Sequence, residues 1–271
     1  MNNLLTTTDL TGVSETLLIT IYLRSLETKR RNKIIQDDKS VEIVNRLNYD
    51  FSKYDSSVNQ ALIAIRTEVI DKFVSSFIVR HPRGTIVNLG AGLCTRFFRL
   101  DNGLIRWFDL DLPNVEPIWH SAIGATSRHQ YLAYSVLDWD WISQVKKAAP
   151  RKVLFIAEGL LMFFSETEVK LLIKNLRDNF PDSELIFDSL GVILAQKSSL
   201  NSGALEINAS YKWGIENLSE MESWGKGIEL VNQCHYLDRH KIRLGWLGLF
   251  SCIPRLRRQV KIGHLRFSSQ D

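Results

Sequence analysis

Cysteine is scarce in this sequence, and its spacing excludes two kinds of small site. The 271 residues include three cysteines, Cys94, Cys234 and Cys252, and no C-x-x-C pair. An odd number of widely separated cysteines argues against a disulfide framework and against a zinc site, and it suits a reducing compartment. We therefore expect no metal ion at the functional site.

Long apolar runs and a strong charge of one sign are also missing. No stretch approaches the ~20 apolar residues that span a membrane, and the N-terminus lacks the basic start of a secretion signal. The 34 Lys and Arg against 30 Asp and Glu give a net charge of only +4, too little to indicate nucleic-acid binding. We expect a cytoplasmic protein that has neither a membrane nor a nucleic acid as its partner. No feature of the sequence indicates an oligomeric state.

The composition is that of a globular enzyme, and apolar runs alternate with helical stretches. Hydrophobic residues make up 45% and charged residues 24% of the chain, which is ordinary for a soluble domain. Expected strands lie at 85–89, 104–108, 130–136, 153–157 and 184–187, and the helical connections between them are typical of β-α-β units and a mostly parallel sheet. Two further strands, at 228–237 and 260–267, are expected to close the sheet, and the alternation in the last is typical of an edge strand.

The chain is divided by these patterns into four parts of one expected domain, 1–271. An N-terminal cap or lid (1–56) is helical at 14–28 and a loop at 29–56, and the core covers 57–190. An inserted cap (191–227) and the closing strands (228–271) follow. A long helix is predicted at 57–79 from apolar residues at helical spacing. Arg66 lies inside its apolar stripe, where a charge is out of place.

A glycine turn follows the first strand, in V-N-L-G-A-G-L-C-T-R-F-F. Gly90 and Gly92 let the backbone turn sharply and leave room for a ligand at the end of the strand. A dinucleotide fold needs a third glycine under its pyrophosphate, and this chain has Thr95 there. The motif therefore favours a nucleoside cofactor without phosphates, and the alternative is a purely structural turn.

Acidic residues follow the next two strands. Asp109 and Asp111 end the second strand in W-F-D-L-D-L-P, about where nucleoside-binding folds place a ribose ligand. We favour Asp111 because it lies nearer the strand's end; the alternative for either is a solvated turn carboxylate. Leu137 and Asp138 follow the third strand, and they either border an adenine ring or cap the next helix.

Glu158 ends the fourth strand, in F-I-A-E-G-L-L-M-F-F. A charge in the middle of a buried sheet needs a partner. One candidate is the cationic end of a ligand, such as a methionine ammonium group. The other is a salt bridge to Arg66 or Arg96.

Together these segments resemble the leucine carboxyl methyltransferase family, and more closely its bacterial branch of polyketide-synthesis O-methyltransferases. The match rests on A-I-R-T-E-V-I-D-K-F, on the motifs quoted above, and on the later segments Y-K-W-G-I, W-G-K-G-I and H-Y-L-D-R-H. The resemblance implies a class I, Rossmann-like α/β fold with a seven-stranded, mostly parallel sheet, helices on both faces and an antiparallel last strand. It also implies S-adenosyl-L-methionine as methyl donor. The implied donor contacts are Arg66 to the carboxylate, Gly90 along the donor, Asp111 to the ribose, Leu137 and Asp138 to the adenine, and Glu158 to the methionine end.

The methyl acceptor is less clear from the sequence. A carboxylate acceptor is already ionised at pH 7, whereas a phenol with a pKa of about 10 would profit from a general base. His235 is a candidate base, and the alternative is a core or rim residue. Trp213 and Trp224 either line an aromatic acceptor pocket or form the core of the cap. We expect O-methylation of a carboxyl or hydroxyl group on a small, polyketide-like molecule. The alternatives are a protein C-terminal carboxylate as the acceptor and a non-catalytic protein of the same fold.

Overall fold

One mixed sheet organises the computed structural model, which describes residues 5, 16–148, 152–200 and 211–269. Within these residues the strand order is β3-β2-β1-β4-β5-β7-β6. The strands are β1 (Thr85–Leu89), β2 (Arg106–Asp111), β3 (His129–Ala133), β4 (Val153–Ala157), β5 (Glu184–Leu190), β6 (Ile228–His235) and β7 (Val260–Phe267). Strands β1 to β5 pair in parallel, and β7 runs antiparallel to both β5 and β6. This topology confirms the predicted α/β fold with a mostly parallel, seven-stranded sheet and an antiparallel last strand.

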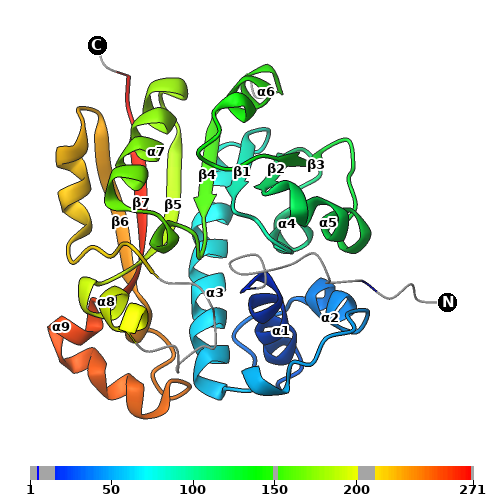
Figure 1. The fold of residues 1–271 in the computed structure, drawn as a ribbon, viewed down its shortest axis with the longest axis vertical. Helices are drawn as coiled ribbons and strands as arrows, with labels where there is room; N and C mark the ends of the chain where they lie inside the picture. Colours follow the sequence, from blue (N-terminus) through cyan, green and yellow to red (C-terminus); the bar gives the residue numbers. More distant parts are fainter. Residues whose placement is uncertain (1–4, 6–15, 149–151, 201–210, 270–271) are drawn as a thin grey trace.

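Helices cover both faces of the sheet (Figure 1). The α-helices are α1 (Thr16–Thr28), α2 (Asp38–Val44), α3 (Ser57–Arg80), α4 (Arg96–Leu100), α5 (Glu116–Ala122), α6 (Asp140–Ala148), α7 (Glu166–Asn179), α8 (Val192–Leu200) and α9 (Pro254–Arg257). Short 3-10 segments lie at Ser52–Tyr54, Pro113–Val115, Leu161–Phe163, Leu218–Trp224, Tyr236–Asp238 and Gly245–Cys252. Helices α6 and α7 pack on one face and α3 on the other. No helix in the described part of the chain combines the length and the apolar character needed to cross a membrane.

The central strands are buried at every position because both faces are covered. Val87 and Leu89 of β1 point into the cluster formed with α6 and α7, whereas Ile86 joins the cluster formed with α3. This pattern explains why β1 and β4 are near-continuous apolar runs in the sequence, as strands of parallel sheets usually are. The long helix α3 begins at Ser56, whose side chain accepts a hydrogen bond from the Asn59 amide.

A third apolar cluster joins the N-terminal helices to the rim of the sheet. Leu18 and Ile21 of α1 are fully buried, and they belong to the same cluster as Ile43 of α2 and Trp119 of α5. Helix α1 therefore packs over the region that follows β1 and β2. This position brings the N-terminal segment to the end of the sheet at which α/β proteins bind ligands.

Two expectations about local structure are wrong. Segment 29–56, expected as a loop, contains α2, because Asp37 caps that helix by accepting from the Ser40 amide and because Ile43 is fully buried. Strand β7 is not an edge strand, since β6 lies outside it. Its polar residues mislead because they are buried with partners: Lys261 Nζ donates to the Glu216 carbonyl, and His264 lies 2.7 Å from a Glu184 oxygen.

The division of the chain into a lid, a core, an inserted cap and closing strands stays a prediction. Residues 1–4, 6–15 and 201–210, which belong to the predicted lid and cap, lie outside the described residues. The described part of the predicted cap contains α8 and the 3-10 segment Leu218–Trp224.

Candidate active site

A cavity of about 790 Å³ lies at the carboxyl ends of the central strands. Its walls come from α1, α3, the glycine turn after β1 and the residues that follow β2, β3, β4 and β5. Strand order reverses between β1 and β4, because β2 and β3 lie on one side of β1 and β4 on the other. Ligands of open α/β sheets bind outside the strand ends at such a reversal, so this cavity is the candidate active site.

The glycine turn forms one wall, and its backbone requires glycine. Gly90 and Gly92 have φ values of 62° and 52°, in the left-handed region that side chains disfavour. A Cβ at Gly90 would lie 2.6 Å from Leu160 Cδ1, and one at Gly92 would lie 2.9 Å from Leu17 Cβ. Both glycines line the cavity. The turn therefore both reverses the chain and forms part of the cavity wall.

Asp111 presents its carboxylate to the cavity. One oxygen, Oδ2, accepts from the Gly92 amide at 2.6 Å, and the other, Oδ1, accepts from the Leu112 amide at 2.7 Å. Burial raises the pKa of Asp111 above its ordinary value. No cation is paired with this carboxylate in the described residues. Each oxygen therefore keeps capacity to accept a further hydrogen bond.

Asp109 is two residues away and has a different environment. It is fully buried and is not part of the cavity wall. Its oxygens accept from Asn88 Nδ2 at 3.1 Å, from Trp107 Nε1 at 3.0 Å and from Trp119 Nε1 at 2.9 Å, and a ring nitrogen of His129 lies 2.7 Å away. The structure thus places Asp109 in the core, and only Asp111 of the two carboxylates is accessible to a ligand.

Arg66 crosses from α3 to the opposite side of the cavity, where two strands end in carboxylates. Its Nε donates to Glu158 Oε1 at 2.9 Å after β4, and its Nη1 donates to Asp188 Oδ2 at 3.3 Å in β5. All three side chains line the cavity and are at most about 10% exposed. Attraction to Glu158 and Asp188 raises the pKa of Arg66 despite its burial, which by itself would lower it. The charge inside the apolar stripe of α3 is thereby explained.

Glu158 is held by a second guanidinium group. Arg96 Nη2 donates to Glu158 Oε2 at 2.5 Å, so both salt bridges considered from the sequence are present. Burial acts to raise the pKa of Glu158, but Arg96 and Arg66 outweigh it and hold that pKa well below its ordinary range. Burial raises the pKa of Asp188, and Arg66 only partly offsets this.

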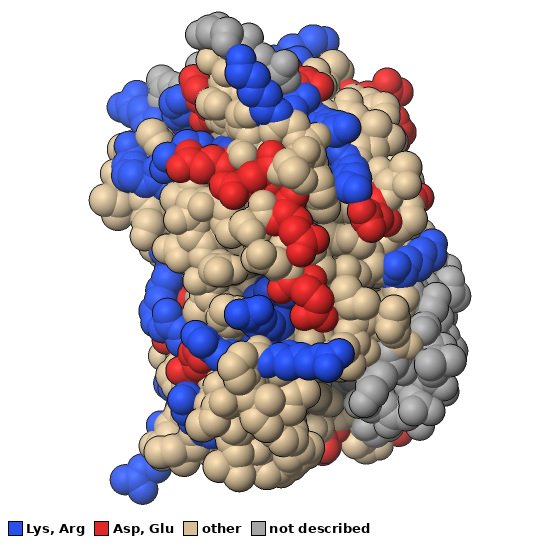
Figure 2. Space-filling model, turned by 90° about the vertical axis from the view of Figure 1, so that its left-hand side faces the viewer, with Lys and Arg blue, Asp and Glu red and all other residues tan. Residues whose placement is uncertain are grey.

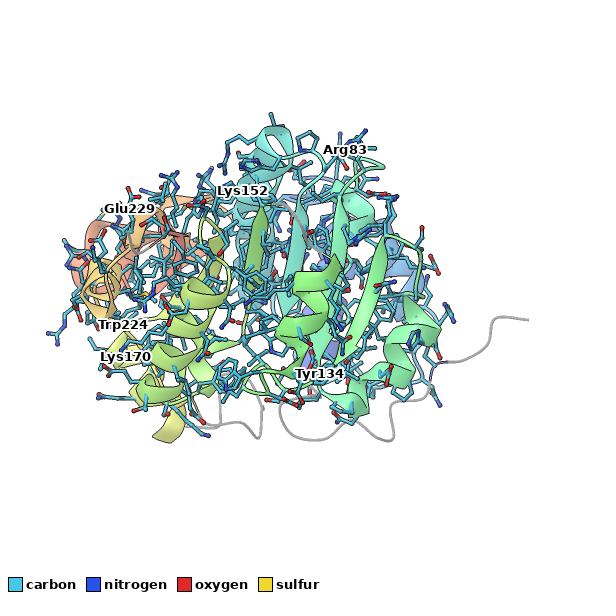
Figure 3. All side chains as sticks on the ribbon, turned by 90° about the horizontal axis from the view of Figure 1, so that it is seen from above. Arg83, Tyr134, Lys152, Lys170, Trp224 and Glu229 are labelled. Atoms are coloured by element: carbon cyan, nitrogen blue, oxygen red, sulfur yellow. The ribbon has the colours of Figure 1, made fainter. Side chains whose placement is uncertain are left out.

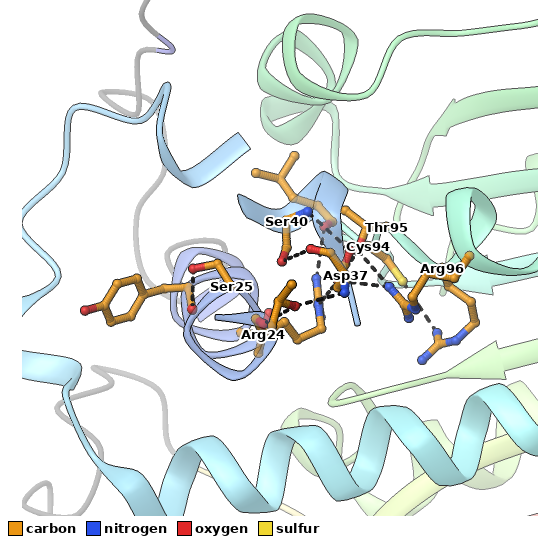
Figure 4. A network of polar contacts seen from close by, with 12 residues as sticks. Arg24, Ser25, Asp37, Ser40, Cys94, Thr95 and Arg96 are labelled. Atoms are coloured by element: carbon orange, nitrogen blue, oxygen red, sulfur yellow. Dashed lines mark hydrogen bonds and ion pairs between the residues drawn. The ribbon is translucent and has the colours of Figure 1, made fainter. Parts of the chain in front are cut away.

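The ionic network continues from Arg96 to the N-terminal segment (Figure 4). Arg96 Nε donates to Asp71, which also accepts from Arg99 Nε at 2.8 Å. Asp37, before α2, in turn pairs with Arg99 and with Arg24 of α1 at 2.9 and 3.1 Å. Arg24 itself lines the cavity. Alternating charges therefore connect α1 to Glu158 through side chains that are at most 16% exposed.

Comparison with known proteins assigns the chain to a family. The model of the leucine carboxyl methyltransferase family matches residues 18–177. The chain is 26% identical to the tetracenomycin polyketide synthesis O-methyltransferase TcmP of Streptomyces glaucescens, over 92% of this chain and 94% of that one. It is 28% identical to the S-adenosyl-L-methionine-dependent methyltransferase dpfgK of Gibberella zeae, over 89% of each chain.

The chain belongs to the leucine carboxyl methyltransferase family. It is an S-adenosyl-L-methionine-dependent methyltransferase, as its family and relatives agree. Among solved structures, a putative methyltransferase from Thermobifida fusca superimposes with a TM-score of 0.63 at 13% identity, with 96% of both chains covered. A protein of the DUF574 family from Streptomyces avermitilis superimposes with a TM-score of 0.57 at 13% identity, with 94% and 97% covered. These likenesses support the fold.

The residues of this methyltransferase fit its donor. The Asp111 carboxylate, which two backbone amides already orient, can accept hydrogen bonds from the uncharged ribose hydroxyls. On the far side of the cavity, Nη2 of Arg66 makes no hydrogen bond within the described residues, so it can still donate to a carboxylate. Bound there, S-adenosyl-L-methionine supplies an electrophilic methyl group on a sulfonium.

Other predicted site residues are not part of the described cavity wall. Leu137 packs against the core and Asp138 is exposed, accepting from the Asp140 amide, whereas Ser135 and Val136 just before them do line the cavity. His235 ends the edge strand β6, and its Nδ1 lies 3.7 Å from Asp238. Burial lowers the pKa of His235.

Trp213 and Trp224 belong to the hydrophobic cluster on the α6 and α7 face of the sheet. Trp213 is 4% exposed and meets Trp224 at 6.2 Å between ring centroids. Lys170 of α7 lies over the Trp224 ring, 5.3 Å from its centroid, and the two are labelled side by side in Figure 3. Neither tryptophan lines the cavity. Neither alternative describes them fully, because the core in which they pack is that of the α6 and α7 face of the sheet.

Asp188 and Tyr236 are site residues that the sequence reasoning missed. The Tyr236 hydroxyl donates to Asp188 Oδ2 at 3.2 Å, and both side chains line the cavity. Asp188 had the same signal as Glu158, an acidic residue near the end of a buried strand. Tyr236 carried no such signal, because its place in the cavity depends on the turn that follows β6.

Proposed function

We propose that this methyltransferase transfers the donor's methyl group to the carboxylate of a small, largely apolar acid. The observation that carries the proposal is the lack of a neutral base in the cavity wall. All six histidines lie in the described residues, and none of them lines the cavity. A carboxylate is ionised at pH 7 and attacks without losing a proton, whereas a phenol has to lose one.

Glu158 and Asp188, the two acidic residues of the cavity that contact Arg66, do not replace a histidine as base. Glu158 is bound by two guanidinium groups, and Asp188 accepts from Arg66, from Tyr236 and from the Gly159 amide at 2.6 Å. Carboxylates engaged in this way hold and orient other groups. The remaining task of the protein is to align the acceptor oxygen with the methyl group. Such alignment can lower the barrier of a displacement by several kcal/mol, up to about 7–11.

We assign a different part of the methyl donor to each end of the cavity. Asp111 takes the ribose hydroxyls, and Ser135 and Val136 border the adenine in place of Leu137 and Asp138. Arg66 binds the donor's carboxylate through its free Nη2. The ammonium group lies against Glu158, whose charge two arginines already balance. The chemistry of each group, together with its place on the cavity wall, supports these roles.

The acceptor's apolar body is assigned to the mouth of the cavity near α8. Phe163 and Tyr211 meet there at 5.4 Å between ring centroids, and Met162, Phe164 and Leu194 line the same cavity. Apolar and aromatic walls with few polar groups are typical of small-molecule sites. The name of TcmP, a polyketide synthesis O-methyltransferase, supports a polyketide-like acceptor.

A matched panel of acceptors tests this function. The purified chain is incubated with S-adenosyl-L-methionine and an aromatic carboxylic acid, the corresponding phenol, or a peptide with a free C-terminus, and products are identified by mass spectrometry. We expect a methyl ester that alkali cleaves. We also expect kcat/KM for the acid to be flat from about pH 6 to 9, because the acceptor's pKa is about 4.

Two results would contradict the assignment. An alkali-stable methyl ether from the phenol, with a rate that rises with pH, would show that a base or an ionised phenol is used. Methylation of the peptide alone would assign the activity to protein C-termini, the alternative that the family's name suggests.

A further inference from the structure

A surface outside the cavity wall carries an unusual set of exposed apolar side chains. In the segment 239–258, Ile242 is 97%, Leu249 72%, Trp246 65% and Ile253 48% exposed. The other large exposed apolar residues in the described chain come singly from separate places. Single exposed apolar residues are ordinary, whereas a contiguous group marks an interaction site. We call 239–258 the 239–258 surface.

The exposure does not come from a loosely attached loop. Leu244 is fully buried, and Leu247 and Phe250 pack against the core on the α3 side of the sheet. Arg243 donates to both oxygens of the buried Glu27, at 3.0 and 2.6 Å. Trp246 contacts Phe250 edge to face, with 5.4 Å between ring centroids. The segment is thus anchored by its inner side chains and presents the others outward.

The same segment is strongly basic. Residues 239–258 include six Lys and Arg and no Asp or Glu. Lys241, Arg255 and Arg258 are exposed, and none of them has a carboxylate within ion-pair distance in the part of the chain described. Figure 2 faces this side and shows a lobe of uncharged residues at its lower end, with Lys and Arg side chains, and some Asp and Glu, along its upper margin. Exposed apolar side chains therefore share this segment with three exposed cations that have no ion-pair partner in the described residues.

We propose that the 239–258 surface docks this methyltransferase onto membranes that contain anionic lipids. Segments that lie in a bilayer interface combine Trp and aliphatic residues on one side with Lys and Arg on the other. Trp prefers the headgroup level, and each cation near an anionic membrane adds to the attraction. The surface meets both requirements without crossing the bilayer. The expectation of no membrane partner rested only on the lack of a spanning run.

A second copy of the chain fits this surface less well. In a symmetric dimer the same patch contacts itself, so the free cations would face their own copies. Like charges placed opposite each other across an interface cost free energy. Anionic headgroups instead complement these cations while the Ile, Leu and Trp tips enter the acyl boundary.

The surface is continuous with the wall of the active site. Tyr236 precedes the segment and Val260 follows it, and both line the cavity. A membrane bound at 239–258 therefore lies beside the methyltransferase cavity. An apolar acceptor dissolved in that membrane would have a short route to the site.

Vesicle binding by the full chain tests the proposal. The protein is floated with vesicles of phosphatidylcholine alone and of phosphatidylcholine mixed with phosphatidylglycerol. We expect binding only to the mixed vesicles. Raising the salt from about 0.1 M to about 1 M shortens the Debye length from about 10 Å to about 3 Å and should release most of the protein.

Two variants and a control locate the contact. Trp246→Ser combined with Leu249→Ser should reduce vesicle partitioning at least about tenfold, because the inserted apolar groups are removed. Arg255→Glu combined with Arg258→Glu should do the same through charge. The control, Val79→Ser, removes a side chain that is 81% exposed on α3, and it should leave partitioning unchanged. Circular dichroism and the thermal midpoint verify that each variant is folded.

Three outcomes would overturn the proposal. The first is no binding of the wild-type chain to anionic vesicles. The second is binding that neither double variant reduces. The third is a concentration-dependent dimer in light scattering that Trp246→Ser with Leu249→Ser abolishes, which would assign the surface to a second copy. None of these results bears on methyl transfer itself, so the proposed function is tested separately.

Discussion

The two ends of the cavity hold their carboxylates in different ways. At the end of β2, Asp111 is oriented by two backbone amides and has no cation partner in the described residues. At β4 and β5, Glu158 and Asp188 are held by Arg66, with Arg96 as a further partner of Glu158. A neutral ligand part such as a ribose needs spare hydrogen-bond capacity, whereas a zwitterionic part needs charges that are already balanced. The contrast assigns the ribose of S-adenosyl-L-methionine to the Asp111 end of the cavity and its amino-acid part to the Glu158 and Asp188 end.

The largest expected effect comes from breaking the charge balance. Arg66→Met leaves Glu158 and Asp188 close together without their shared cation. Removing one partner of a buried ion pair costs about 3–5 kcal/mol, and we expect a loss of that order in the free energy of unfolding at pH 7. Chemical denaturation measures it.

A second arginine of α3 provides the matched control. Arg80 donates to both oxygens of Glu184 in β5, but its side chain is 43% exposed. Solvent screens such a pair, so Arg80→Met should cost about 1 kcal/mol or less. Equal losses in the two variants would show that the burial of the Arg66 network is not what makes it important.

Acid should reduce the defect of Arg66→Met. In the wild type the pKa of Glu158 is lowered, so its stabilising contribution is present above the unfolded pKa, about 4.3, and is lost as the pH falls through the folded value. In the variant, loss of the cation should raise the pKa of Asp188 further above its unfolded value, and it should raise the pKa of Glu158 from its lowered value although Arg96 remains. Protonation then relieves the repulsion, and the stability difference between the two proteins should shrink below about pH 5. A difference that stays constant from pH 7 to 4 would contradict this.

A smaller effect should separate Asp109 from Asp111. Asp109→Asn turns one oxygen that accepts buried N–H groups into a donor, and an unsatisfied buried group costs about 1–3 kcal/mol. We expect that loss in the free energy of unfolding. The affinity of the folded variant for S-adenosyl-L-methionine should change little. Asp111→Asn should show a smaller loss of stability, because its carboxylate faces the cavity, together with a Kd for S-adenosyl-L-methionine that is about tenfold higher, which corresponds to about 1.4 kcal/mol. Equal changes in stability and in affinity for S-adenosyl-L-methionine in the two variants would contradict the assignment of Asp109 to the core and Asp111 to the ligand.

The sequence predicts the sheet well because its signals are local. Short apolar runs set β1, β4 and β7 to the residue, and the glycines after β1 mark the turn through their backbone requirement. The last strand's place in the sheet was missed, because Lys261 and His264 look exposed in sequence and are buried only through partners far along the chain. Pairings of that kind leave no local trace.

The residues of the site that have a local sequence signal could also be predicted. Arg66, Gly90, Gly92, Asp111 and Glu158 were recognised by position, since each is a polar or strained residue in an otherwise apolar context, and all five line one cavity. Asp109 carried the same signal as Asp111, and only the tryptophans around it distinguish the two. His235 attracted attention for its chemistry, but its place on an edge strand depends on the sheet order.

The most direct test of the division between the two ends is a calorimetric titration with two ligands. S-adenosyl-L-methionine carries both halves, whereas 5′-methylthioadenosine keeps the adenosine and lacks the amino-acid end. The wild type, Asp111→Asn and a conservative Arg66→Lys variant are compared at a temperature where all three are folded. The account predicts that Asp111→Asn weakens both ligands and that Arg66→Lys weakens only S-adenosyl-L-methionine. Equal weakening of both ligands by Arg66→Lys, or of neither by Asp111→Asn, would contradict it.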